Sequence, residues 1–174
     1  MQQLQSYEEM SFKEELWNAI THGAGFLISI PVTVLLIIHA SSMNSPVHIV
    51  TFSIFGSSVI LLFLMSTLLH SMPVKYKRFF AILDHSSIYI LIAGTYTPFL
   101  LIAIGGALGI TLLCIIWSIA LFGVVFKCYF IDRFETFSLA LYIAMGWMIV
   151  FAIKPVYAYL QVEGFVILVL GGIL

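Results

Sequence analysis

The chain has 174 residues, of which 62% are hydrophobic and only 9% are charged. A soluble domain of this size keeps about 25% of its residues charged, so the composition excludes a soluble protein and indicates that lipid is the solvent. The formal net charge of −1 gives no support to nucleic-acid binding. Membrane lipids are therefore the expected partners.

Two long stretches of the chain contain no Asp, Glu, Lys or Arg, namely residues 16–74 and 85–126. A spanning helix needs about 20 apolar residues, so each stretch has room for two helices and a short turn. We predict an all-α, polytopic transmembrane helix bundle with five complete spans and a sixth that is cut short. The predicted spans are 18–39, 48–70, 85–104, 107–127 and 136–153, with the sixth beginning near Gly164.

Proline and glycine mark the ends of the predicted spans. Pro73 follows the second span, the pair Gly105-Gly106 breaks the chain after the third, and Lys154-Pro155 ends the fifth. Residues 1–17 are predicted to be a separate N-terminal segment, and residues 18–174 form the bundle. The residues after Gly164 reach only about half of a bilayer at about 1.5 Å per residue, so we expect the chain to be a fragment of a longer protein.

Lys and Arg are divided unequally between the two sides of the predicted membrane. If the N-terminus is cytoplasmic, Lys154 is the one basic residue on the outer side. An excess of Lys and Arg is typical of cytoplasmic segments, so we predict a multi-pass protein of the cell membrane with a cytoplasmic N-terminus. The basic residues then on the cytoplasmic side are Lys13, Lys75, Lys77, Arg78, Lys127 and Arg133.

Polar residues gather at the cytoplasmic ends of three predicted helices. Asn18 and His22 lie at the start of the first span, Ser66 and His70 lie at the end of the second, and Asp84 directly precedes the third. Successive antiparallel spans bring these three ends to the same side of the membrane, so we expect His22, Ser66, His70 and Asp84 to share one depth. Ionisable residues within spans are costly and usually mark a functional site.

Each of these residues also has a purely structural explanation. His22 and His70 are near the interface, where an imidazole reaches water, and Asp84 could be the N-cap of the third helix. The combination of His, Ser and Asp from three helices nevertheless favours a site. Imidazole and a carboxylate linked through water suit zinc, which takes nitrogen and oxygen ligands.

Three stretches carry a resemblance to a known family. They are residues 14–23 (EELWNAITHG), residues 66–70 (STLLH), and residues 84–98, which begin with Asp84 and end in AGTYTP. With these motifs in this order, the chain resembles the hemolysin III branch of the progestin and adipoQ receptor family.

The resemblance implies seven helices and a zinc ion held by a histidine of the second helix and by an H-x-x-x-H on the seventh. Transferred to this sequence, it makes His70 a zinc ligand, Asp84 a partner of the zinc through water, and Ser66 the serine of the site. No H-x-x-x-H occurs in the 174 residues. We therefore expect the complete protein to bind zinc more firmly than this chain alone.

Three functions fit the sequence. The resemblance suggests a zinc-dependent hydrolase of a lipid amide or ester at the cytoplasmic leaflet, with Ser66 and Asp84 catalytic and with Asn18 and His22 beside them. The second is a cytolytic pore, as the word hemolysin implies, although no span carries a polar stripe along its full length. The third is a non-enzymatic sensor or receptor for membrane homeostasis, which the sequence does not separate from the first.

The orientation can be tested with a reporter enzyme that is active only outside the cytoplasm. We expect activity from a fusion at Ser45 and none from a fusion at Lys77, because the basic segments stay inside. A fusion to a reporter that is active only in the cytoplasm should give the inverse pattern. Activity of the first reporter at Lys77 would contradict the predicted orientation.

Overall fold

The structure is a computed structural model that describes residues 12–131 and 133–173. These residues are almost entirely helical and contain no β-strand, which confirms the predicted all-α class. The helices are α2 (Phe12–Ser42), α3 (Pro46–Ser71), α4 (Val74–Pro98), the π-helical segment η1 (Phe99–Ile104), α5 (Gly106–Phe130), α6 (Glu135–Trp147), the 3-10 segment η2 (Met148–Ala152) and α7 (Ile153–Ile173).

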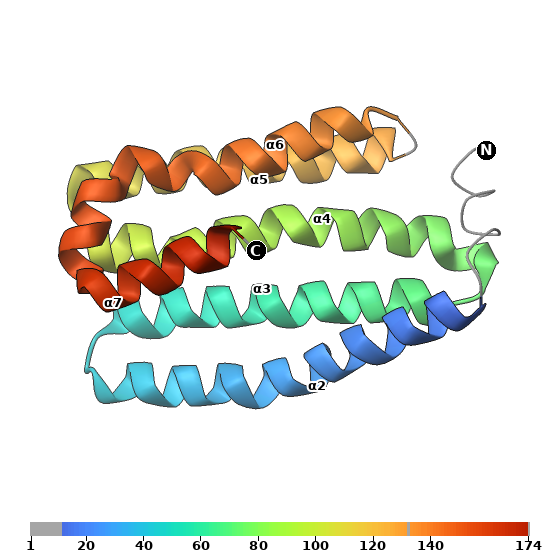
Figure 1. The fold of residues 1–174 in the computed structure, drawn as a ribbon, viewed down its shortest axis with the longest axis horizontal. Coiled ribbons are helices and arrows are strands. Elements are labelled where there is room, and N and C mark those ends of the chain that lie inside the picture. The colour runs from blue at the N-terminus through green and yellow to red at the C-terminus, as the bar shows by residue number, and fades with distance from the viewer. Residues whose placement is uncertain (1–11, 132, 174) are drawn as a thin grey trace.

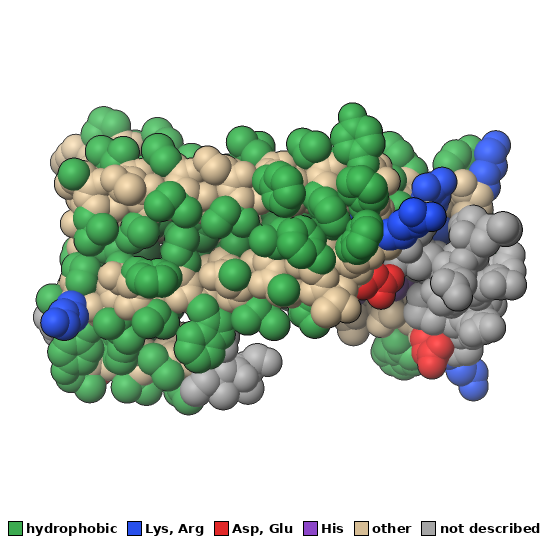
Figure 2. All heavy atoms as spheres, turned by 90° about the horizontal axis from the view of Figure 1, so that it is seen from above, with side chains coloured by type: hydrophobic (Ala, Val, Ile, Leu, Met, Phe, Trp, Pro, Cys, Tyr) green, Lys and Arg blue, Asp and Glu red, His purple; other side chains and the backbone are tan. Residues whose placement is uncertain are grey.

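Among the described residues, five helical segments are long and apolar enough to cross a membrane. They are Phe12–Ser42, Pro46–Ser71, Val74–Ile104, Gly106–Phe130 and Glu135–Leu160, and they lie side by side with alternating directions (Figure 1). Hydrophobic side chains cover the middle of the bundle, and the charged side chains lie at its two ends (Figure 2). A surface of this kind is stable in lipid, where only helices or closed sheets satisfy the backbone, so the prediction of a multi-pass membrane protein is confirmed.

Small residues let neighbouring helices approach closely. Gly56 of α3 faces Thr33 of α2, and Gly94 of α4 faces Ser58 of α3, so that a Cβ atom at either glycine would overlap the facing side chain. Gly123 of α5 meets a tyrosine ring of α4 in the same way. Close packing through small residues is a main source of attraction between helices in lipid, and here it fixes the register of α2, α3, α4 and α5.

The break predicted after the third span is confirmed. Gly105 and Gly106 have φ values of 63° and 56°, a region in which residues with a Cβ are strained. The π-helical segment η1 directly follows Pro98, because proline lacks the N–H that would continue the regular hydrogen bonding of α4.

Two helices begin well before their predicted starts. α2 begins at Phe12, so residues 12–17 belong to the first helix, while residues 1–11 of the predicted N-terminal segment lie outside the described residues. α4 begins at Val74, with Pro73 at the N-cap position, so Asp84 lies about three turns inside the helix and is not its N-cap. The prediction equated each helix with its apolar stretch, whereas a helix continues past the hydrocarbon into the headgroup region, where charged residues are tolerated.

The predicted end of the fifth span is wrong. α6 ends at Trp147, and α7 begins at Ile153, so Lys154 and Pro155 start a helix instead of ending one. Residues 155–163, which the prediction left between the fifth and sixth spans, are helical, and no new helix begins near Gly164. Pro155 is the third residue of α7, and a proline in the first turn removes no hydrogen bond within the helix.

Tyr96 of α4 supplies the hydrogen bonds that the interruption between α6 and η2 needs. Its hydroxyl donates to the carbonyl oxygen of Gly146 at 2.5 Å and accepts the N–H of Ile149 at 2.9 Å. Lipid offers no alternative partner to these two backbone groups. Tyr96 therefore allows α6 to change its helical form and fastens it to α4.

We expect Tyr96→Phe to lower the free energy of unfolding by about 1–3 kcal/mol, since the change leaves buried backbone groups without a partner. Thermal unfolding in detergent would measure the effect. Tyr129→Phe is the matched control, because Tyr129 is 78% exposed on α5. Equal midpoints for the two variants would contradict the role of the Tyr96 hydroxyl.

Candidate functional site

The predicted site residues meet at the end of the bundle where α2 begins (Figure 1). Asn18 and His22 lie in the first turns of α2, and Ser66 and His70 lie in the last turns of α3. Asp84 lies in the first half of α4, where a side chain projects sideways against the neighbouring helices. The early start of α4 is thus what brings this carboxylate into the bundle.

Asp84 lies at the centre of a polar cluster. The Ser66 hydroxyl is close enough to donate a hydrogen bond to its carboxylate, and the imidazoles of His85, His70 and His22 are close enough to interact with it electrostatically. The two imidazole rings stack, with their centroids 5.9 Å apart and their planes at 23°. The structure therefore brings together His22, Ser66, His70 and Asp84, which we call the Asp84 cluster.

One nitrogen of the Asp84 cluster stands out. His22 Nδ1 is buried and has no hydrogen-bond partner among the described residues. Buried polar atoms in proteins nearly always have a partner, which can be an ordered water or a bound ligand. His22 therefore adds hydrogen-bonding capacity to the Asp84 cluster beyond what its protein neighbours use.

Asn18 and His85 stand beside the Asp84 cluster. Asn18 lies one turn before His22 on the same face of α2, and the described contact is to its backbone oxygen, which accepts the Thr21 hydroxyl at 3.1 Å. His85 Nδ1 hydrogen-bonds to the Ala81 carbonyl oxygen at 2.7 Å and is 4.0 Å from the Asp84 carboxylate. His85 is thus held mainly by its own helix.

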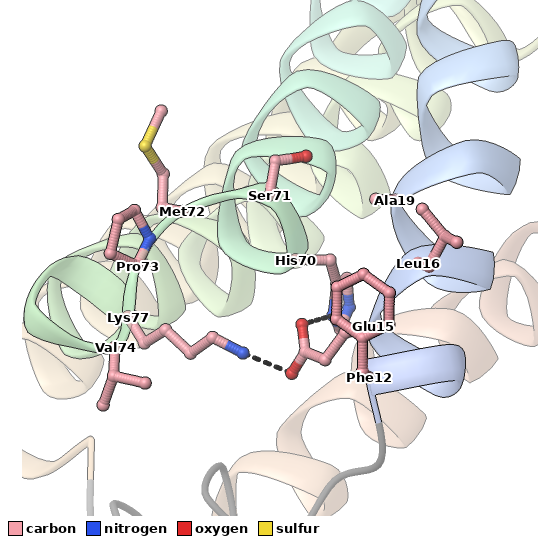
Figure 3. Close-up of a pocket in the computed structure, with 10 residues that line it drawn as sticks. All are labelled: Phe12, Glu15, Leu16, Ala19, His70, Ser71, Met72, Pro73, Val74 and Lys77. Carbon is pink, nitrogen blue, oxygen red and sulfur yellow. Dashed lines mark hydrogen bonds and ion pairs between the residues drawn. The ribbon is translucent and has the colours of Figure 1, made fainter.

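Two charged residues that sequence reasoning missed extend the Asp84 cluster. Glu15 Oε2 lies 3.3 Å from His70 Nδ1, and Glu15 Oε1 pairs with the ammonium of Lys77 (Figure 3). The side chains of Glu15, His70 and Lys77 are 13%, 14% and 7% exposed. A signal was present for Glu15, because Glu15, Asn18 and His22 follow the spacing of one helix face.

A cavity of about 680 Å³ leads to His70 from this end of the bundle. Its walls are mostly apolar, with polar groups where Glu15, His70 and Lys77 meet (Figure 3). The lining residues are Phe12, Glu15, Leu16, Ala19, His70, Ser71, Met72, Pro73, Val74 and Lys77. An amphipathic molecule therefore matches its walls better than a purely polar one.

The Asp84 cluster fits zinc in the kind of its side chains but not in their number. Catalytic zinc takes three protein ligands and a water, and His70 and Asp84 are of suitable chemistry. Within the part of the chain that the structure describes, no group of three His, Cys, Asp or Glu side chains could hold a metal ion. Any zinc held at His70 needs further ligands.

Comparison with known proteins agrees with the motifs. The profile of the family described as "Haemolysin-III related" matches residues 10–174. The chain is 56% identical over 165 residues to a "Hemolysin-3 homolog" of Bacillus subtilis (strain 168), covering 94% of this chain and 78% of that protein. It is 55% identical over 163 residues to "Hemolysin-3" of Bacillus cereus, covering 93% and 74%. The resemblance seen in the sequence is thus confirmed, and the chain belongs to the haemolysin III family of membrane proteins.

Proposed function

We propose that this protein is a hydrolase that cleaves a lipid amide or ester at the cytoplasmic leaflet. The observation that carries the proposal is the Asp84 carboxylate, which lies close to Ser66, His70 and His22 within a lipid-embedded bundle. Carboxylate, hydroxyl and imidazole are the groups that move protons and stabilise charge in hydrolysis. A bundle that needed only stability would gain little from placing them together.

The roles follow from the chemistry of each side chain. Hydrolysis needs a water oriented towards the carbonyl carbon and a donor for the negative charge that develops on the carbonyl oxygen. Asp84 is suited to orient that water and accept its proton, and the Ser66 hydroxyl is suited to donate a hydrogen bond to the water or to the developing oxyanion. His22, with its unpartnered Nδ1, is a further partner for the substrate or the water.

The cavity and the charges support a lipid substrate at the cytoplasmic side. The cavity at His70 has mostly apolar walls with polar groups at Glu15, His70 and Lys77. This combination suits the part of a lipid where the polar headgroup joins the apolar chains. Basic residues at the start of α4 and at the end of α5 lie at the same end of the bundle, whereas Lys154 lies at the start of α7, which begins at the other end (Figure 1). By the positive-inside tendency this end faces the cytoplasm.

Zinc is proposed as the cofactor, with His70 as one ligand and Asp84 in contact through water. When bound, zinc supplies a Lewis acid that makes water nucleophilic near neutral pH. The family resemblance assigns the remaining ligands to an H-x-x-x-H of a seventh helix.

We expect the 174-residue chain to keep well below one zinc per chain through purification, because fewer than three donors converge among the residues described. Elemental analysis of the purified chain would measure the ratio, with His70→Ala as the comparison. One zinc per chain that disappears in His70→Ala would show that the ligand set proposed here is too small.

A pore is less well supported by the structure. Tyr89, Ala93, Ile116 and Met145 lie in the hydrophobic core and are 0% exposed. They fill the interior between α4, α5 and α6, where a monomeric pore would need a continuous polar lining. The relatives carry the name hemolysin, but the described helices favour a local site at one end of the bundle.

The hydrolase proposal is tested by offering ceramide and phospholipid to the purified protein in lipid nanodiscs, with zinc in excess in the buffer, and measuring released fatty acid. We expect Asp84→Asn to lower turnover about 10²–10⁴-fold, as is typical when a general base is lost. Glu163→Gln makes the same chemical change on the exposed surface of α7 and should leave turnover unaltered. Release of no fatty acid by the unaltered protein, or equal turnover by Asp84→Asn, would contradict the proposal.

A further inference from the structure

We propose that Glu15 is a positioning residue, which fixes the tautomer and the orientation of His70. A role of Glu15 in the reaction rests on the proposed function, whereas the effect of Glu15 on the His70 imidazole does not depend on that function. Glu15 joins α2 to α3 through His70 Nδ1 at 3.3 Å and to α4 through the Lys77 ammonium (Figure 3). The three side chains are largely buried, so water competes little for these contacts.

The position of the proton on the neutral His70 ring follows from the hydrogen-bonding capacity of the Glu15 carboxylate. An ionised carboxylate only accepts hydrogen bonds, and the other oxygen of Glu15 already pairs with the Lys77 ammonium. The proton of neutral His70 must then lie on Nδ1, which donates to Glu15. Nε2 is left without a proton, and it is therefore the nitrogen that is free to bind a metal ion or accept a proton.

The orientation of the ring is fixed by the same contacts. Glu15 holds the Nδ1 side of the imidazole, and the His22 ring stacks against its face. Rotation of the ring would break the bond to Glu15, so Nε2 stays on the side away from Glu15. Carboxylates that accept from one nitrogen of a functional histidine act in this way in many metal sites.

Stability alone does not explain the presence of these charges. Burying an ion pair costs desolvation that its attraction often fails to offset, and apolar residues of similar volume are frequently as stabilising. Small residues already bring α2, α3 and α4 into close contact without charges. The charges of Glu15 and Lys77 are thus better explained by the state they impose on His70.

The tautomer can be read by ¹⁵N NMR of histidine-labelled protein in nanodiscs with a chelator present, so that no metal selects the nitrogen. We expect the neutral His70 ring to carry its proton on Nδ1, the nitrogen that faces Glu15. The His70 signal is assigned by its loss in His70→Ala. In Glu15→Ala the Nε2-protonated form should become the major one, and Glu15→Gln should retain part of the original state, because its amide oxygen still accepts a hydrogen bond.

Two further variants keep the test decisive. Glu14→Gln makes the same chemical change one residue away on the exposed side of α2 and should leave the His70 signals in place. If Glu15→Ala fails to fold, the double variant Glu15→Leu/Lys77→Met replaces the pair by apolar groups and should still shift the tautomer. A proton on Nε2 in the unaltered protein, or an unaltered tautomer in the folded Glu15 variants, would overturn the proposal.

Turnover separates this proposal from the hydrolase proposal. We expect Glu15→Ala to lower kcat about 10–100-fold, the usual effect of losing such a partner, with KM nearly unchanged. A shifted His70 tautomer with unaltered kcat in Glu15→Ala would contradict a role of Glu15 in the reaction. If even the unaltered protein shows no hydrolysis, the hydrolase proposal fails, while the NMR result still decides whether Glu15 positions His70.

Discussion

Lipid offers no hydrogen-bond partner to a polypeptide, so the backbone groups of this chain that enter the hydrocarbon must find their partners within the protein. The five spanning segments meet this requirement along their length by being helical. Where the helix changes form between Gly146 and Ile149, the Tyr96 hydroxyl takes over the backbone hydrogen bonds. The same requirement explains why small residues line the contacts between helices, since close packing replaces the hydrophobic effect as the source of attraction.

The requirement also explains why the ionisable groups form pairs and clusters at the ends of helices. Near the headgroups a charge is less costly than in the centre of the bilayer, and there Glu15, His70 and Lys77 join three helices. Slightly deeper along the same helices, Ser66 and His70 approach Asp84. The partly polar cavity beside His70 connects this arrangement to the surface. The ionisable contacts, the Asp84 cluster and the cavity thus lie at one end of an otherwise apolar bundle.

The three motifs that identify the haemolysin III family are distant in sequence but meet in space. Glu15 and His22 come from the first motif, His70 from the second and Asp84 from the third. The contacts among them pass from α2 to α3 and from α3 to α4. This convergence gives the family motifs a physical meaning, because each motif supplies a polar side chain to the same place in the bundle.

The sequence by itself determined the solvent, the helical class and which ends of the helices carry polar residues, because these follow from composition and from the length of apolar stretches. It also indicated His22, Ser66, His70 and Asp84, since antiparallel spans must bring their ends to one side. Only the tertiary structure decided that α4 begins at Val74 and that Pro155 starts a helix, because helix ends outside the hydrocarbon are set by packing and not by hydropathy. It alone revealed the contact of Glu15 with His70 and Lys77, because which charges pair depends on the rotation and register of three helices, and these are fixed by side-chain packing between residues far apart in the chain.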